Sequence, residues 1–150
     1  NTNGGVVGNG RAFRVLSNIV TQNVTNGVAT KVQLNVKDFD THNCFDNVTN
    51  FRFQPPVAGF YHINGSIRVN GSALTWCYPM LYKSGVFYKN GVAISGVIAG
   101  VDLAVTDLMY LNGTTDYAEL FATVTGTSPS LWYGSVGAAC YFSGYLVRSA

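Results

Sequence analysis

Charged residues are scarce in this chain, and it has no apolar run long enough to cross a membrane. Only 11% of its 150 residues are Asp, Glu, Lys or Arg, whereas an average soluble protein has about 25%. The nine basic residues are scattered singly, so no basic stripe indicates nucleic acid binding. No stretch approaches the roughly 18 consecutive apolar residues of a membrane span. We therefore expect neither a nucleic acid partner nor insertion into a membrane.

Residue types that carry out catalysis are also few. The only two histidines, His42 and His62, are separated by twenty positions. The chain contains no G-x-S-x-G elbow, no C-x-x-C or H-E-x-x-H pair, no P-loop and no G-x-G-x-x-G fingerprint. Because no catalytic constellation can be assembled, the sequence predicts a protein that is not an enzyme and that carries no cofactor.

Acidic residues gather in one short stretch, KDFDTHNCFDN at residues 37–47. Its Asp38, Asp40 and Asp46 could supply oxygen ligands to a hard cation such as calcium. Asp and Asn side chains in loops more commonly accept hydrogen bonds from the backbone of their own turn. We favour this second interpretation, a solvated loop without a cation.

Cysteine is limited to Cys44, Cys77 and Cys140. An odd number leaves at least one thiol unpaired and argues against a disulfide framework. Cys44 lies in the polar stretch just described, and the other two lie in apolar, strand-like segments. We expect three free thiols, two of them acting as small buried hydrophobic residues. A Cys77–Cys140 bridge is the alternative.

Strand patterns and turn residues, in contrast, are abundant. In FRFQPPVAGFYHINGSIRV, residues 51–69, two prolines interrupt the chain and an alternating run follows. Proline has no backbone N–H for a strand ladder, so the pair marks a turn or an edge. Alternate residues from Tyr61 to Val69 then share an apolar face, and those from His62 to Asn70 share a polar face. This pattern is typical of an antiparallel corner in an all-β protein.

No window of the sequence has a convincing helical period, and strand candidates follow one another along the whole chain. The predicted strands are Ala12–Val20, Val28–Val36, Phe51–Phe53, Gly59–Asn70, Trp76–Tyr88, Ala93–Ala99, Asp107–Leu111, Tyr117–Thr125 and Leu131–Val147, the last read as two strands. Turns are predicted at Asn26-Gly27, Lys89-Asn90-Gly91, Asn112-Gly113 and Ser128-Pro129. We therefore predict one all-β domain, a two-sheet sandwich or jelly roll, over residues 12–150. Residues 1–11, rich in Gly and Asn, are predicted to be a flexible arm.

Three segments, in order, resemble the complement component 1q globular-head and tumour necrosis factor-like superfamily. They are DFDTHNCFDNVTNFRFQPPVAGFYHINGSIRV, then LYKSGVFYKNG with LMYLNGTTDYAELFA, and finally YFSGYLVRSA. The family's central hallmark matches at Asp40, Phe45, Phe53, Gly59, Tyr61 and Ile63. Its F-S-G-x-L-V ending matches at Phe142, Ser143, Gly144, Leu146 and Val147. The sequences of these segments are most similar to versions of this domain in bacteriophage structural proteins. The chain departs from the family pattern at Ile63 and Gly65, where aromatic residues are usual.

The resemblance implies an antiparallel jelly roll of about ten strands that assembles as a homotrimer. The residues that would fill the sandwich core are Phe53, Tyr61, Ile63, Ile67, Phe142 and Leu146. Those that would face the neighbouring subunits are His62, Asn64, Ser66, Tyr141, Ser143 and Tyr145. A cation such as calcium on the trimer axis is a further alternative, with candidate ligands Asp102, Asp107 and Asp116.

The resemblance also implies a structural protein of the virion, an extracellular particle assembled in the host cytoplasm. As a trimeric fibre domain it would join a fibre shaft and contact a glycan or protein on the host surface through loops at one end. The candidate contact aromatics are Trp76, Tyr78, Tyr82, Tyr88 and Trp132. Two alternatives are a capsid decoration protein that stabilises the phage head and a secreted complement 1q-like recognition ligand. The sequence does not discriminate between the tail and the head of a phage.

Overall fold

The computed structural model describes residues 10–97, 99–134 and 139–150, and every regular element in these ranges is a β-strand. The strands are β1 (Ala12–Leu16), β2 (Thr21–Asn23), β3 (Thr30–Lys31), β4 (Val36–Asp40), β5 (Phe45–Asp46), β6 (Arg52–Phe53), β7 (Ala58–Lys83), β8 (Val86–Asn90), β9 (Ile94–Val97), β10 (Val101–Asn112), β11 (Ala118–Trp132) and β12 (Tyr141–Ser149). All their pairings are antiparallel. The predicted all-β antiparallel jelly roll is confirmed, with twelve strands where about ten were expected. Among the described residues, no helix could span a membrane.

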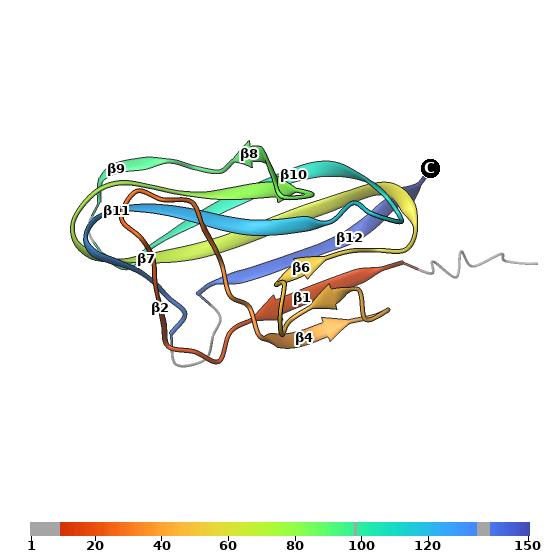
Figure 1. The fold of residues 1–150 in the computed structure, drawn as a ribbon, viewed down its shortest axis with the longest axis horizontal. Helices are drawn as coiled ribbons and strands as arrows, with labels where there is room; N and C mark the ends of the chain where they lie inside the picture. Colours follow the sequence, from red (N-terminus) through yellow and green to blue (C-terminus); the bar gives the residue numbers. More distant parts are fainter. Residues whose placement is uncertain (1–9, 98, 135–138) are drawn as a thin grey trace, which may run out of the picture.

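The strands form two layers that share the long strand β7 (Figure 1). The first half of β7 pairs with β10 and β12, and β1 and β4 extend this front layer in the order β4-β1-β12-β7-β10. The second half of β7 pairs with β11, β9 and β8, and forms the back layer together with β2, β3 and β6. The chain bends between the halves at Gly71 and Ala73, which both have positive φ angles, 138° and 48°.

Aromatic rings fill the core between the layers. Phe13 stacks on Phe53 with ring centroids 4.1 Å apart and meets the edge of Phe142 at 5.2 Å. Tyr61 packs edge-on against Phe53 at 5.5 Å, and its hydroxyl donates to the carbonyl of Val57 at 2.9 Å. Aromatic pairs of this kind add about 0.5–1.5 kcal/mol each beyond their buried area. They hold the ends of β1, β6, β7 and β12 together.

The residues predicted for the core lie there in the structure. Five are at most 1% exposed, and the sixth, Leu146, is partly buried and packs against them. The close approach of the two layers also explains why residue 65 is a glycine, at a position where the family usually has an aromatic residue. A Cβ at Gly65 would lie 2.6 Å from Cδ1 of Leu120, so the leucine occupies the space that a larger side chain would need.

Several strand boundaries differ from the prediction. The segments Gly59–Asn70 and Trp76–Tyr88 are not two strands with a break before Trp76, because β7 runs without interruption through that position. The chain turns instead at Ser84-Gly85, whose φ angles of 52° and 78° suit a tight hairpin turn. The turn predicted at Ser128-Pro129 is an irregularity inside β11, where Ser128 has a φ of 48°.

Two other predicted strands have different lengths. Only Thr30–Lys31 of the segment Val28–Val36 is regular strand before β4 begins, although Val32 and Leu34 still point into the core at 1% exposure. The predicted strand Asp107–Leu111 is the end of the longer β10.

The folded domain begins slightly before the predicted boundary at residue 12. Arg11 accepts a hydrogen bond on its carbonyl from the N–H of Leu146 at 2.9 Å, and the carbonyl of Gly10 accepts one from the hydroxyl of Thr41 at 3.4 Å. These two residues therefore contact the front layer. The rest of the predicted arm, residues 1–9, lies outside the described residues.

Candidate interaction face

Alternate residues of the front-layer strands point away from the core and form one continuous surface, which we call the front face. The rows that cross from β1 or β12 to β10 are Arg14–Ser143–Asn64–Thr106, Ala12–Tyr145–His62–Leu108, Tyr141–Ser66–Ala104 and Arg148–Phe60–Tyr110. All six residues assigned to the subunit interface lie in these rows. The fold brings them together on one side of one sheet, and their contact with another subunit stays a prediction.

Polar side chains in the middle of the front face bind one another. The hydroxyl of Ser143 donates to Oδ1 of Asn64 at 3.1 Å, and the Nδ2 group of Asn64 donates to the Ser143 carbonyl at 3.4 Å. Nε2 of His62 lies 3.1 Å from the hydroxyl of Thr106, and the His62 ring lies 5.3 Å from that of Tyr145. Nδ1 of His62 is buried without a hydrogen-bond partner. The other polar groups named here are hydrogen-bonded within the chain, so covering them leaves few further polar atoms without hydrogen bonds.

Large apolar side chains surround this polar centre and remain exposed. Five of them are between 39% and 50% accessible to solvent: Phe39, Phe60, Leu108, Tyr110 and Tyr145. Sequence reasoning identified only Tyr145. The sequence nevertheless contained a pattern that could have identified Leu108 and Tyr110. They alternate with Met109 and Leu111, which are buried in the core, so both faces of this strand are apolar. A strand that is apolar on both faces is typical of one that is covered on both sides.

A second exposed apolar surface lies at the edge strand β8. All five of its residues are exposed, and Val86, Phe87 and Tyr88 are 68%, 51% and 40% accessible. The hydroxyl of Tyr88 donates to the carbonyl of Leu108 on β10 at 3.1 Å, so this edge adjoins the front face. Natural proteins usually cover or charge an edge strand of this kind.

The aromatics predicted to contact a receptor lie on strands, so the prediction that loops at one end present them is wrong. They belong to the second half of β7, to β8 and to β11. Trp76 is 48% exposed and meets Tyr78 edge-on at 6.2 Å. Tyr82 stacks on Phe121 at 4.0 Å, and the Trp132 ring is covered by the guanidinium of Arg68 at 5.1 Å. Alternation along a long strand, rather than a loop, places the β7 aromatics on the outer side of the back layer.

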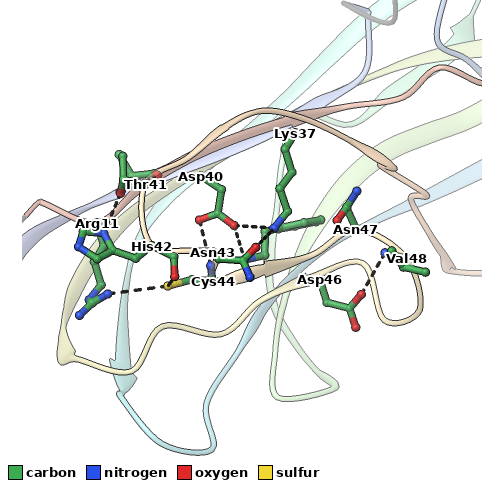
Figure 2. Close-up of polar contacts among 12 residues, drawn as sticks. Arg11, Lys37, Asp40, Thr41, His42, Asn43, Cys44, Asp46, Asn47 and Val48 are labelled. Atoms are coloured by element: carbon green, nitrogen blue, oxygen red, sulfur yellow. Dashed lines mark hydrogen bonds and ion pairs between the residues drawn. The ribbon is translucent and has the colours of Figure 1, made fainter.

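The acidic stretch is a hydrogen-bonded turn (Figure 2). The Asp40 carboxylate accepts the N–H groups of Cys44 and Phe45 at 2.9 and 2.8 Å and lies 3.0 Å from Nζ of Lys37. Burial would raise the pKa of Asp40, but these three contacts lower it below its ordinary 3.8. The Asp46 carboxylate accepts N–H groups of residues 48–50, which lowers the pKa of Asp46 to about 2.

These contacts leave the acidic side chains dispersed. Asp38 pairs with Arg14 at 2.7 Å, away from Asp40 and Asp46. In the ranges that the structure describes, no three His, Cys, Asp or Glu side chains are grouped closely enough to hold a metal ion. The local turn hydrogen bonds that we favoured are the arrangement observed.

The three cysteines are buried, free thiols. Burial raises the pKa of Cys44 and Cys77 above the ordinary value and that of Cys140 to about 12. A buried thiol with a raised pKa is a poor nucleophile. The predicted free thiols are thus observed, and the alternative Cys77–Cys140 bridge is wrong.

Comparison with known proteins agrees with this geometry. No protein-family model matches the sequence, and no curated protein matches it. Among solved structures, 125 chains match. The globular domain of zebrafish complement 1qA is 16% identical over 93% of this chain and 98% of that one, with a TM-score of 0.64. Murine APRIL, in structures at pH 8.5 and 8.0, is 8% identical over 92% of this chain and 99% of that one, with TM-scores of 0.66 and 0.67.

The chain has the complement 1q and tumour necrosis factor-like jelly-roll fold. Identities this low establish the fold alone, since one fold can carry unrelated functions. The fold expected from the hallmark residues is confirmed, and the resemblance to bacteriophage proteins stays a prediction.

Proposed function

We propose that this chain is a non-enzymatic recognition domain that works as a homotrimer, and that it forms the host-attachment tip of a bacteriophage fibre. The observation that carries the proposal is the front face, where exposed aromatic and aliphatic side chains surround polar groups that, apart from Nδ1 of His62, are hydrogen-bonded within the chain. Monomeric proteins rarely expose a contiguous apolar surface of this kind, which instead marks an interaction site.

A second copy of the chain is the occupant that fits the front face best. Each chain has two different apolar surfaces, the front face and the β8 edge. A two-fold dimer would use the same patch on both subunits. Contact between two different patches instead generates a ring, provided that the rotation relating neighbouring subunits brings the last subunit into contact with the first. We propose that the β8 edge of one chain covers the front face of the next and that three chains close the ring, as the family resemblance implies.

Support for a virion comes from the sequence. The segments FDTHNCFDN, YLNGTTDYAEL and FSGYLVRSA resemble bacteriophage versions of the domain. In that setting the partners are two further copies, a fibre shaft and a glycan or protein on the host surface, and the protein is located in the virion. Trp76 and Tyr78 lie on the outer side of the back layer, away from the front face, whereas Tyr88 lies on the β8 edge and would be covered in the proposed ring. Trp76 is the most exposed of the aromatics proposed to contact the host.

A secreted complement 1q-like recognition ligand is the second candidate. It is favoured by the likeness to zebrafish complement 1qA, whose identity of 16% is twice that of APRIL. Both candidates require the same trimer, so assembly is the first property to test.

Light scattering at micromolar and nanomolar concentration tests the assembly. We expect a species of three times 16.1 kDa. Burying the exposed half of Leu108 contributes about 1 kcal/mol per chain, so Leu108→Lys should weaken the trimer by about 3 kcal/mol, at least a hundredfold in its dissociation constant. Val48→Lys is the matched control, because Val48 is 78% exposed and lies off the front face and the β8 edge. A wild-type monomer, or equal effects of the two variants, would contradict the proposal.

Adsorption assays distinguish the candidate functions. A fibre tip should compete with phage for host cells, and Trp76→Ala should reduce that competition without changing the mass of the trimer. Binding to empty capsids would instead identify a decoration protein, and binding to animal cells or immune proteins would support the secreted ligand.

A further inference from the structure

His62 lies in the middle of the front face, and one of its two ring nitrogens has no hydrogen-bond partner. Its Nε2 lies 3.1 Å from the hydroxyl of Thr106 on β10. Its Nδ1 is buried, and no atom of the described residues donates a hydrogen bond to it or accepts one from it. Buried polar groups in native proteins nearly always have a partner, so an exception calls for a physical explanation.

This environment favours the neutral imidazole. A neutral ring has one N–H, which His62 can carry on Nε2 and donate to Thr106, while the Thr106 hydroxyl donates to the carbonyl of Ile63 at 3.3 Å. An imidazolium has an N–H on both nitrogens. In the charged form of His62, the Nδ1–H group would therefore be buried without an acceptor. Burying a charged donor without a partner costs more free energy than burying a neutral polar atom, so the packing around His62 opposes its protonation.

The charged groups of the front layer also oppose a proton on His62. Four carboxylates belong to the other strands of this layer, and each already has a cation within 4.0 Å: Asp102 with Arg68, Asp107 with Lys89, Asp38 with Arg14 and Asp40 with Lys37. The remaining titratable side chains of the two flanking strands, β10 and β12, are Tyr110, Tyr141, Tyr145 and Arg148. Arg148 lies in the row next to His62 and forms no ion pair with any described residue. A proton on His62 would therefore add positive charge where no carboxylate is free to compensate it.

We propose that His62 is a pH sensor of assembly, so that the trimer is stable while its three imidazoles are neutral and weakens when they are protonated. This inference rests on the trimer proposed above, in which the β8 edge of one chain covers the front face of the next. The only charged residue of β8 is Lys89, so the covering strand brings a further cation and no carboxylate. Histidine ordinarily changes its charge between pH 5 and 8, and the sensor acts in this range.

Tyr145 accounts for the difference between a free chain and the trimer. Its ring lies 5.3 Å from that of His62, and 50% of the residue is exposed. In a free chain an exposed side chain changes rotamer within nanoseconds, and movement of Tyr145 admits water to the imidazole. In the trimer the neighbouring chain holds Tyr145 in place and keeps water out. Free chains therefore bind protons on His62 more readily than the trimer does, and a lower pH shifts the equilibrium towards free chains.

Light scattering on a dilution series at pH 7.5 and pH 5.0, at constant ionic strength, tests the sensor. Carboxyl groups ordinarily have pKa values near 4 and stay ionised at both pH values, so the histidines are the side chains that titrate. Separation of the trimer takes up three protons, and we expect its dissociation constant to rise at least about a hundredfold at pH 5.0. The circular dichroism spectrum should not change, because the chains separate without unfolding.

His62→Gln removes the titration but keeps an amide that can bind the hydroxyl of Thr106. The dissociation constants of its trimer at the two pH values should agree within about threefold. His42→Gln is the matched control, because His42 is exposed in the turn between β4 and β5, where its Nδ1 lies 2.9 Å from the hydroxyl of Thr41. This variant should respond to pH as the wild type does. If His62→Gln has an altered circular dichroism spectrum at pH 7.5, His62→Asn is the second variant that cannot titrate.

The possible results separate this inference from the proposed trimer. A wild-type trimer whose dissociation constant is the same at both pH values would overturn the sensor and leave the trimer intact. Equal pH dependence of the wild type and His62→Gln, or unfolding of the wild type at pH 5.0, would also overturn the sensor alone. A wild-type monomer at pH 7.5 would contradict both proposals.

Discussion

Replacing Asp40 by asparagine should destabilise the fold strongly, although the two side chains have nearly the same shape. The Asp40 side chain is only 3% exposed, and its two oxygens accept the N–H groups of Cys44 and Phe45 while Lys37 lies 3.0 Å away. An asparagine oxygen can accept one N–H, but its amide group would face the other donor. A hydrogen bond to a charged group contributes about 1.5–3 kcal/mol, and an unsatisfied buried donor costs about 1–3 kcal/mol. We therefore expect Asp40→Asn to lower the free energy of unfolding by about 2–4 kcal/mol.

The matched control is the same substitution two residues earlier on β4. The Asp38 side chain is 46% exposed and contacts Arg14 at the surface. Exposed ion pairs of this kind contribute about 0–1 kcal/mol. Asp38→Asn should therefore change stability by less than about 1 kcal/mol.

Urea unfolding at one fixed protein concentration and several pH values measures both effects. The pKa of Asp40 is lowered in the folded state, so its contribution is complete at pH 7 and is lost as pH falls from about 4 through the folded pKa. The difference between wild type and Asp40→Asn should therefore shrink below pH 4. A cost under about 0.5 kcal/mol at pH 7, or a difference that does not change with pH, would refute the role given to this carboxylate.

Two further predictions concern packing and the thiols. Gly144→Ala should cost about 1–3 kcal/mol in urea unfolding, because its Cβ would lie 2.7 Å from the His62 carbonyl oxygen and 3.0 Å from the Phe13 ring; unchanged stability would mean that β12 can move away from β7. Ellman's reagent should label no thiol in the folded protein and three per chain after unfolding, since all three cysteines are buried and free. Rapid labelling of any one of them in the folded state would contradict the observed burial.

Much of the fold could be predicted because period-two alternation is a local property. The alternate residues from Tyr61 to Val69 were predicted to share one apolar face, and the four with side chains beyond Cα are completely buried. The Asn112-Gly113 turn was predicted from turn chemistry, and Gly113 has the required positive φ of 74°. The boundaries of the strands were less predictable, because they depend on pairing between segments that are distant in sequence. For example, β7 continues past Gly71 and Ala73 because it pairs there with β11 and β9.

Alternation along single strands was not enough to predict which residues make up the front face. Alternation identified His62, Asn64 and Ser66 as a polar face, but it did not identify Phe39 or Leu108 as members of the same surface. Those residues join it only because β4 and β10 lie at opposite margins of the front layer. Their register is set by backbone pairing across the sheet.

The sequence by itself determined the all-β class, the strand faces and the presence of at least one unpaired thiol, because composition and alternation can be read without knowing the fold; that Cys77 and Cys140 do not pair was decided by the structure. Only the tertiary structure decided which charges have partners. Arg11 and Arg148 are separated by almost the whole chain, yet β1 and β12 are neighbours in the front layer and bring them to one cavity. Which arginines lack a carboxylate depends on distances across the whole fold, because an ion pair forms wherever two charges meet in space.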